Sequence, residues 1–362
     1  MSDWKPQVVR VEKVEKHPFA DSLDIVTVLG DYPVVTKLGE YQVNDLTCYL
    51  PIDTIVPDTE LFYFLCPQKT EKYQENDEIK IRSLGPKYSI GSVPENYRII
   101  KAKKLRGVYS QGLLIRVPNV NIDSNLVDLL SLKKYEEDEE ENISPIKKLG
   151  SAIAEKSPQG WSMPYYDIDG LRKYINCISP DEEIVLTEKL HGSSSSVCHD
   201  GNRLWVKSRN FYKKKDPEDL WWDIAIRYNL EEKLAKYPNL AFYGELYGLV
   251  KNFRYDCISQ SGIVQSKIAF FDIWDVKNMR YLDYDDFLFI IKDLGLTPAP
   301  ELYRGFWKDK QEMYSYAEGQ TTFGGKNIRV GIVVKTVKER FEPKINSRMQ
   351  FKLVGEGYNL KK

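Results

Sequence analysis

The sequence has few of the residues that build metal sites and disulfide frameworks. Its 362 residues include five cysteines and three histidines, and the cysteines are scattered without a C-x-x-C pair. A structural zinc site and a disulfide scaffold are therefore not expected. No apolar run approaches the roughly 18 residues of a membrane span, and the N-terminus lacks the apolar core of a signal peptide. We expect a reducing, intracellular compartment, cytoplasmic or nuclear, and no membrane association.

The chain also lacks an excess of charge of either sign, with 52 Lys and Arg against 53 Asp and Glu. Without a global basic field, any binding of nucleic acid must come from local patches. The hydrophobic fraction is 42%, with 24 Tyr and 14 Phe, which is a globular composition. The length suggests about two domains.

Short strands separated by turn signals fill the first part of the chain, which predicts a small barrel or sandwich over 1–120. The leucines within 125–135 have roughly helical spacing, and six consecutive acids follow at 136–141, a composition typical of a solvated linker. We therefore assign 121–155 to a helical and acidic linker. The strands of the first part are expected at 8–11, 24–29, 33–36, 46–50 and 78–81.

Strands and helices mix in the remainder, 156–362, which predicts an α+β domain. Amphipathic helices are expected at 219–237 and 285–294. Strands are expected at 183–189, 240–245, 267–273, 330–335 and 350–354.

One lysine stands at the end of a predicted strand, in the run Glu188-Lys189-Leu190-His191-Gly192-Ser193-Ser194. An amine is nucleophilic only when neutral, and a free lysine has a pKa of ~10.4. Burial or a nearby cation would lower that pKa. A neutral Lys189 can attack the α-phosphate of a nucleotide, form a phosphoramidate and expel pyrophosphate, while the serines offer donors to anions. Taken alone, the run also fits a surface lysine before a Gly-Ser turn.

Further motifs follow in a fixed order, and the set resembles the covalent nucleotidyltransferases. The form E-K-x-H-G-S is similar to that of ATP-dependent RNA ligases. The other segments of the resemblance are Ser208-Arg209-Asn210, with the arginine 20 residues after the lysine, then 242–248, 270–273, 331–335 and 350–352.

The resemblance implies a role for each motif residue. Lys189 is the nucleophile, and Glu188 accepts a hydrogen bond from the adenine amino group. Arg209 holds phosphate or ribose with its planar donor fork. The remaining nucleotide-binding residues are Leu190, Ser194, Glu245 (which also supports a divalent cation), Phe271 (which stacks on the base), and Lys335 and Lys352 (which neutralise the triphosphate).

Two positions depart from the family pattern. Val330 stands where the fourth motif usually has a glutamate that helps to hold the hydration shell of the metal. Gln350 stands where the fifth motif usually has a lysine, which leaves Lys352. Both changes remove charge from the surroundings of the triphosphate, so either the metal-dependent steps are slower or other groups compensate.

The first part of the chain resembles the OB-type domain of the fifth RNA ligase family, on residues 49–57 and 97–113. In that group the OB domain precedes the catalytic domain, and little sequence follows the last motif here. The resemblance therefore implies an N-terminal OB-type β-barrel and then a two-sheet nucleotidyltransferase domain of the ATP-grasp-like ligase type.

A basic stretch within the first domain, Lys101, Lys103, Lys104 and Arg106, is interleaved with Tyr97 and Tyr109. Barrel faces that carry cations and aromatics suit nucleic-acid strands, so we interpret this stretch as RNA-binding. A solvated strand edge protected by lysines is the alternative. The run 213–215 is equally compatible with a phosphate contact and with a solvated loop.

Together the resemblances imply an ATP-dependent RNA ligase that joins RNA 3′-OH and 5′-phosphate ends through lysyl-AMP and AMP-capped RNA. It would require Mg²⁺ or Mn²⁺, act on RNA that is nicked within a duplex, and need no obligate protein partner. Three alternatives stay open. The first is another nucleotidyltransferase, either a DNA ligase or a GTP-using capping enzyme. The second is a weakened or inactive RNA-binding protein of the same fold, and the third is a tRNA-binding or editing module based on the first domain.

Overall fold

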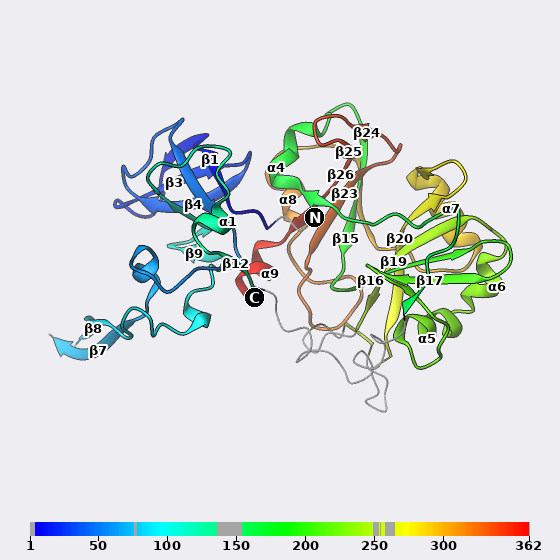
Figure 1. Ribbon diagram of the computed structural model, residues 1–362. Helices are drawn as coiled ribbons and strands as arrows, with labels where there is room; N and C mark the ends of the chain where they lie inside the picture. The colour runs from blue at the N-terminus through cyan, green and yellow to red at the C-terminus, as the bar shows by residue number, and fades with distance from the viewer. Residues whose placement is uncertain are drawn as a thin grey trace. The chain divides into compact units, whose positions relative to one another are not determined.

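The structure is a computed structural model that describes residues 4–75, 78–135, 154–248, 253, 255–257 and 265–361. It divides into two compact units, residues 2–137 and residues 138–361, and Figure 1 shows the elements of each. The acidic run 136–141 and the predicted linker as far as residue 153 lie outside the described residues. The predicted limits of the domains therefore stay a prediction.

Two three-stranded antiparallel sheets form the centre of the N-terminal unit. Residues of β3 alternate between buried and partly exposed positions, as the two-residue period of a strand requires. Valines and tyrosines from both sheets, among them Val9, Val26, Val34 and Tyr49, share one core. The sheets consist of β1 (Gln7–Arg10), β5 (Leu46–Leu50) and β11 (Leu113–Ile115), and of β2 (Lys13–Lys16), β3 (Leu23–Val28) and β4 (Tyr32–Lys37).

Smaller pairs and short helices complete this unit. The helix predicted within 125–135 is the single turn α1 (Leu126–Leu129), which the Asn125 side chain caps. The strand pairs are β7 (Gln68–Glu75) with β8 (Glu78–Pro86), β9 (Lys103–Leu105) with β10 (Val108–Ser110), and β6 (Thr54–Ile55) with β12 (Lys133–Lys134); the 3₁₀ turns are η1 (Glu60–Leu65) and η2 (Glu95–Tyr97).

Two sheets dominate the C-terminal unit. The seven-stranded sheet has the order β13 (Ala154–Glu155), β18 (Tyr212–Lys213), β17 (Leu204–Ser208), β16 (Gly192–His199), β19 (Leu240–Tyr247), β20 (Lys267–Asp275) and β21 (Arg280–Tyr281). The five-stranded sheet has the order β14 (Asp169–Gly170), β26 (Gln350–Val354), β23 (Gly331–Thr336), β15 (Glu183–Lys189) and β22 (Glu301–Phe306). A further hairpin joins β24 (Phe341–Glu342) and β25 (Ser347–Arg348).

The helix predicted over 219–237 is two helices, because Asn229 adopts a left-handed conformation with φ of 51° and interrupts the chain between them. The helices of this unit are α4 (Leu171–Tyr174), α5 (Leu220–Arg227), α6 (Leu230–Leu234), α7 (Tyr284–Asp293), α8 (Lys310–Ser315) and α9 (Glu356–Lys361), with the 3₁₀ turn η3 (Ile175–Cys177).

Each sheet of the C-terminal unit buries one face against helices. Phe242 and Phe270 of the seven-stranded sheet share a core with α5, α6 and α7. Phe351 of the five-stranded sheet shares another with α4 and α8. The predicted α+β class with two sheets is confirmed. In the part of the chain that the structure describes, no helix is long and apolar enough to span a membrane.

Candidate active site

The predicted nucleophile stands where the chain crosses from one sheet to the other. Lys189 ends β15 of the five-stranded sheet, opposite Gly331, and Gly192 begins β16 of the seven-stranded sheet. A Cβ atom on Gly192 would lie 1.9 Å from the backbone oxygen of Leu246. Only glycine allows this close approach of β16 to β19, which explains the glycine of the motif.

The serines after Gly192 form a strand rather than a turn. Residues 192–198 pair with β19, and residues 195–199 pair with β17, so β16 is a central strand. The Gly-Ser turn that this run alone suggested is therefore wrong. Where β16 is paired on both sides, its backbone N–H groups are used within the sheet. Ser194 still lines the cavity described next.

A cavity of ≈ 440 Å³ opens beside the crossing. This volume lies within the about 300–1,000 Å³ that is typical of small-molecule sites. The structure gathers every predicted catalytic and nucleotide-binding residue in its lining, from both sheets: Glu188, Lys189, Leu190, Ser194, Arg209, Glu245, Phe271, Lys335 and Lys352.

The surroundings of Lys189 favour its neutral amine. Burial lowers the pKa of Lys189; Glu245 opposes this shift, while the cations Lys352 and Arg209 add to it. The Nζ atom donates a hydrogen bond to the backbone oxygen of Leu190 at 3.3 Å, and no ion pair to a carboxylate is formed among the described residues. The amine is thus placed as a nucleophile requires.

Glu188 lines the cavity, but its carboxylate is already used within the protein. It accepts hydrogen bonds from the Thr321 hydroxyl, and from the backbone N–H and the hydroxyl of Thr322 at 2.9 and 2.7 Å. The Nε atom of Arg329 lies 3.6 Å from the same carboxylate. The contact of Glu188 with adenine stays a prediction.

Arg209 is held at the cavity by a segment that precedes the motifs. Its Nε atom donates to the Tyr165 hydroxyl at 2.7 Å, and its guanidinium lies 3.3 Å from the Asp167 carboxylate. The guanidinium carbon is also 5.2 Å from the centre of the Tyr165 ring. The donor fork is therefore oriented, although the side chain is exposed to solvent.

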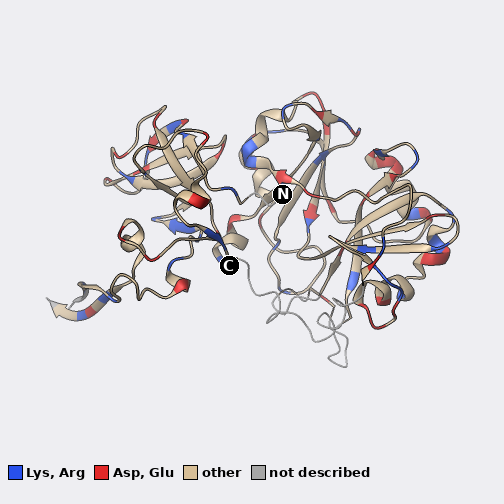
Figure 2. Ribbon diagram, viewed as in Figure 1, with Lys and Arg blue, Asp and Glu red and all other residues tan. Residues whose placement is uncertain are grey.

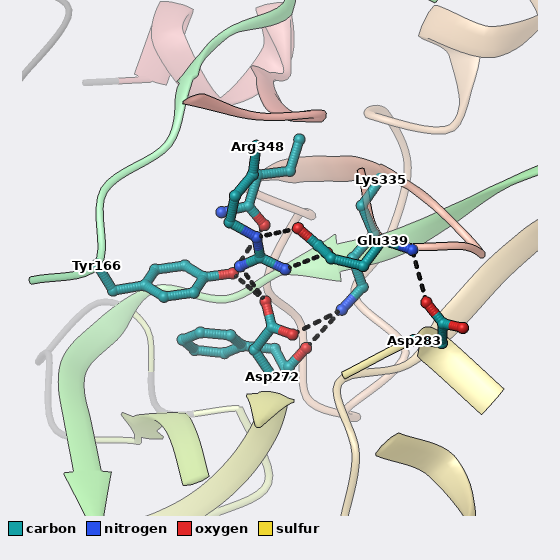
Figure 3. Close-up of polar contacts among 8 residues, drawn as sticks. Tyr166, Asp272, Asp283, Lys335, Glu339 and Arg348 are labelled. Atoms are coloured by element: carbon teal, nitrogen blue, oxygen red, sulfur yellow. Dashed lines mark hydrogen bonds and ion pairs between the residues drawn. The ribbon is translucent and has the colours of Figure 1, made fainter. Parts of the chain in front are cut away.

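Lys335 belongs to a polar network around the buried carboxylate of Asp272 (Figure 3). The Lys335 amine donates to the backbone oxygen of Phe271 at 2.7 Å and lies 3.6 Å from the Asp272 carboxylate. Asp272 also accepts hydrogen bonds from Arg348 and from the Tyr166 hydroxyl, each at 2.7 Å. The Tyr166 ring centre is 5.0 Å from that of Phe271.

The charges of this network oppose the effects of burial. Burial raises the pKa of Asp272, but Arg348 and Lys335 outweigh burial and hold that pKa below its ordinary value. Burial lowers the pKa of Lys335, and Asp272 opposes that shift. Glu339 completes the network with two hydrogen bonds from Arg348, both at 2.6 Å.

The two departures from the family pattern are both buried. Gln350 has its side-chain oxygen 2.9 Å from the Tyr166 hydroxyl and so belongs to the same network. Val330 accepts a backbone hydrogen bond from Gly355 and offers no ligand with its side chain. Among the described residues, no group of three or more His, Cys, Asp or Glu side chains is arranged to hold a metal ion.

The predicted RNA-binding residues Lys101, Lys103, Lys104 and Arg106 lie in the N-terminal unit and are exposed. Of the two interleaved tyrosines, Tyr109 is buried, and Tyr97 lies against Tyr88 with ring centres 5.7 Å apart.

The run 213–215 in the C-terminal unit does not fit either prediction, a phosphate contact or a solvated loop, along its whole length. Its first lysine, Lys213, is buried in an ion pair with Asp219 at 2.9 Å.

Sequence reasoning missed several residues of the cavity wall, including Tyr166, Asp167 and Trp221. Trp221 fell within a predicted helix and was interpreted as part of its apolar face. The segment around Tyr166 has no periodic pattern. One available signal was Asp272, a carboxylate within the otherwise apolar strand 268–273, because buried charges are normally paired.

Two family models match the chain, one in each unit. Residues 182–354 match the RNA ligase model, and residues 6–93 match an OB-fold domain model. No curated protein sequence matches the chain. The matches confirm the resemblance that the motifs predicted.

Solved structures share the fold along the whole chain. A structure of Naegleria gruberi RNA ligase with PPi is 19% identical, with a TM-score of 0.73 over 100% of this chain and 99% of that one. A variant of the same ligase with ATP and Mn is 20% identical, with a TM-score of 0.73 and 99% of each chain covered. A third, with AMP and Mn, is 18% identical with a TM-score of 0.70, and 99% and 98% of the two chains are covered. These likenesses establish a common fold.

Proposed function

We propose that the protein is an ATP-dependent RNA ligase that works through a covalent lysyl-AMP intermediate. The observation that carries the proposal is the buried amine of Lys189. It lines a cavity of nucleotide size, and its pKa is lowered by burial and by two cations. The match of residues 182–354 to the RNA ligase model supports this assignment.

The first step is the attack of the Lys189 amine on the α-phosphorus of ATP. A P–N bond forms, the bond to the pyrophosphate oxygen breaks, and the amine loses a proton. Lys352 and Arg209 lie close enough to affect the pKa of that amine, so their charges also stabilise the phosphoryl group as negative charge develops on it. The Phe271 ring in the cavity wall offers a face for the base.

The next two steps move AMP and then release it. The 5′-phosphate of the RNA attacks the lysyl-AMP, which frees the amine and leaves AMP on the RNA end. The RNA 3′-OH then attacks the 5′-phosphorus, so that a phosphodiester forms and AMP leaves. In both steps the residues of the cavity mainly position the reactants and stabilise charge.

The residues present fit a divalent cation that is held largely by the nucleotide. Mg²⁺ is commonly bound through one or two carboxylates together with substrate phosphates and water, and Glu245 is a carboxylate of the cavity wall near Lys189. When bound, the ion neutralises phosphate charge. The Naegleria ligase has been solved with ATP and Mn, which supports the choice of substrate and ion.

Adduct formation tests the nucleophile directly. The protein is incubated with ATP and Mg²⁺, and its intact mass and modified peptide are measured. We expect one added AMP on Lys189 and none on a Lys189→Met variant. Lys207→Met is the matched control, because Lys207 is also buried and also has a lowered pKa, but it is absent from the cavity wall. An adduct on Lys189→Met would show that the assignment is wrong.

The substrate class is tested separately. We propose RNA nicked within a duplex as the substrate, so sealing is compared on nicks with RNA or DNA at the 3′-OH end. Labelled GTP in place of ATP identifies a capping-type enzyme. Preferred sealing of a DNA 3′-OH end would favour a DNA ligase.

Val330→Glu addresses the alternative of a weakened enzyme. Restoring the carboxylate that the family motif usually has is expected to lower the Mg²⁺ concentration needed for half-maximal adduct formation. An unchanged Mg²⁺ dependence would mean that Glu245 and the triphosphate already suffice. No adduct in either protein would favour a nucleotide-binding protein without catalysis.

A further inference from the structure

The basic stretch of the N-terminal unit forms a short, tightly turned hairpin. Strands β9 and β10 are joined by Arg106 and Gly107, whose φ angles of 42° and 90° are those of a two-residue hairpin turn with both central residues left-handed. Figure 2 shows the basic residues of this hairpin in blue. With three residues in each strand, its cations lie within about 10 Å of the turn.

The cations of this hairpin and of the residues just before it have no anionic partner in the part of the chain that the structure describes. Among the described residues, no ion pair involves Lys101, Lys103, Lys104 or Arg106, although exposed ion pairs occur elsewhere in the same unit, as between Lys13 and Glu15 at 2.8 Å. Positive charge that the chain leaves unpaired and exposed is available to an external anion.

An aromatic ring lies directly on the turn. A Cβ atom on Gly107 would be 3.6 Å from the ring of Phe19, so this ring covers the backbone of the turn. The rest of the Phe19 side chain faces solvent, and 68% of the residue is exposed. An isolated exposed apolar residue is unremarkable, but this ring lies beside a cluster of unpaired cations.

The ring is presented by a fixed backbone. The Nδ1 atom of His17 accepts a hydrogen bond from the backbone N–H of Phe19 at 3.1 Å, and its Nε2 atom lies 3.0 Å from the backbone oxygen of Leu105 in β9. This arrangement requires a proton on Nε2. Because His17 connects the loop to the hairpin, little ordering is needed when a ligand reaches the ring.

We propose that Phe19 is the stacking platform of an RNA-binding surface, made of Phe19 with Lys103, Lys104 and Arg106. An unpaired nucleobase stacks on the ring, and the cations contact the adjacent phosphates. Cationic surfaces that carry aromatic rings bind single-stranded nucleic acid in this way, and each stacked base contributes about 1–3 kcal/mol. This inference rests on the proposed RNA ligase function. It makes Phe19 the aromatic residue that accompanies the cations, a role that the buried Tyr109 does not fill.

The test is binding of a fluorescein-labelled 12-nucleotide single-stranded RNA to the full-length protein, measured by anisotropy across a series of salt concentrations. Phe19→Ala is expected to weaken binding about tenfold and to leave the slope of log K against log salt unchanged. The double variant Lys104→Ala with Arg106→Ala is expected to reduce the magnitude of that slope by about 1.4, because each single-strand phosphate contact contributes about 0.7.

Conservative variants distinguish stacking from a structural role. Phe19→Trp should bind as the parent does, whereas Phe19→Leu should resemble Phe19→Ala. Phe289→Ala is the matched control, because Phe289 is 70% exposed on α7 of the C-terminal unit. Full binding by Phe19→Ala, or by Phe19→Leu, would overturn the proposal. So would displacement of the RNA by polyglutamate at equal charge concentration, since that would indicate a site for acidic protein.

The AMP adduct on Lys189 is measured in the same preparations. If the adduct forms and RNA binding is insensitive to Phe19, this inference fails and the proposed function stands. If binding depends on Phe19 but no adduct forms, the RNA-binding surface stands and the proposed ligase chemistry fails.

Discussion

The carboxylate of Asp272 is the group on which the buried network depends most. Its side chain is 1% exposed, and it lies against the cations of Arg348 and Lys335, at 2.7 and 3.6 Å. Asp272→Asn preserves the shape of the side chain and removes its charge. Glu339 would then remain paired with Arg348, but the Lys335 amine would lose the carboxylate that it now faces.

Breaking a buried ion pair by removal of one partner costs about 3–5 kcal/mol. We expect about 3 kcal/mol for Asp272→Asn, near the lower end, because the Lys335 amine can release its proton and so avoid an unpaired buried charge. Burial already lowers the pKa of Lys335 and favours this release. The free energy of unfolding is measured with urea and tryptophan fluorescence, since six of the seven tryptophans follow residue 160.

The effect also depends on pH in a defined direction. The pKa of Asp272 is depressed in the folded protein, so its charge contributes stability above the unfolded pKa of about 3.9, and that contribution is lost as the pH falls through the folded pKa. The difference between parent and variant should therefore be full at pH 7 and shrink below about pH 4.

The control for this experiment removes an exposed ion pair at the edge of the same network. Lys338 is 2.9 Å from Asp283, but its side chain is 78% exposed, so Lys338→Ala should change the urea midpoint little. Equal midpoints for Asp272→Asn and the parent at pH 7 would refute the view that the buried network depends on this carboxylate. A deficit that does not shrink as the pH falls below about 4 would show that shape, not charge, is responsible.

Two further predictions concern Lys189 and Gly192. The neutral fraction of the Lys189 amine grows as the pH rises, and because its pKa is lowered this change is complete at a lower pH than for a free lysine. The rate of adduct formation should therefore increase with pH and level off below the pKa of ~10.4 of a free lysine. A rate that still rises at pH 10 would contradict this. Gly192→Ala should lower the free energy of unfolding by about 1–3 kcal/mol and abolish the adduct, because its Cβ would lie 1.9 Å from the Leu246 oxygen. Unfolding by urea and intact mass check both effects, and a normal adduct would show that β16 can shift without loss.

The motif residues were predictable from the sequence because each occupies a fixed place on a strand. Lys189, Glu245, Phe271, Lys335 and Lys352 all lie on predicted strands. The order of these strands along the chain matches a known pattern, so the cavity could be anticipated although the strands are distant in sequence. The strand β16 was missed because its serines have low strand propensity, and pairing on both sides overrides that preference.

The supporting residues could not be predicted, because their roles arise from tertiary contacts. Tyr166 contacts Asp272, which is 106 residues away, and Glu188 is bonded to Thr322, which is 134 residues away. Neither contact leaves a periodic signal in the sequence. The break between α5 and α6 likewise depends on the left-handed conformation of Asn229, which asparagine tolerates but does not require.

The network explains why a neutral side chain stands at position 350. Two carboxylates, Asp272 and Glu339, face two cations, Lys335 and Arg348, so the buried charges balance. Gln350 contacts this set through the Tyr166 hydroxyl. A lysine at the same place would add a third cation to the two that already share Asp272, and a buried charge without a partner is costly. Arg348, two residues before Gln350, is already paired with Asp272 and Glu339. A neutral side chain at position 350 therefore leaves the buried charges of the network balanced.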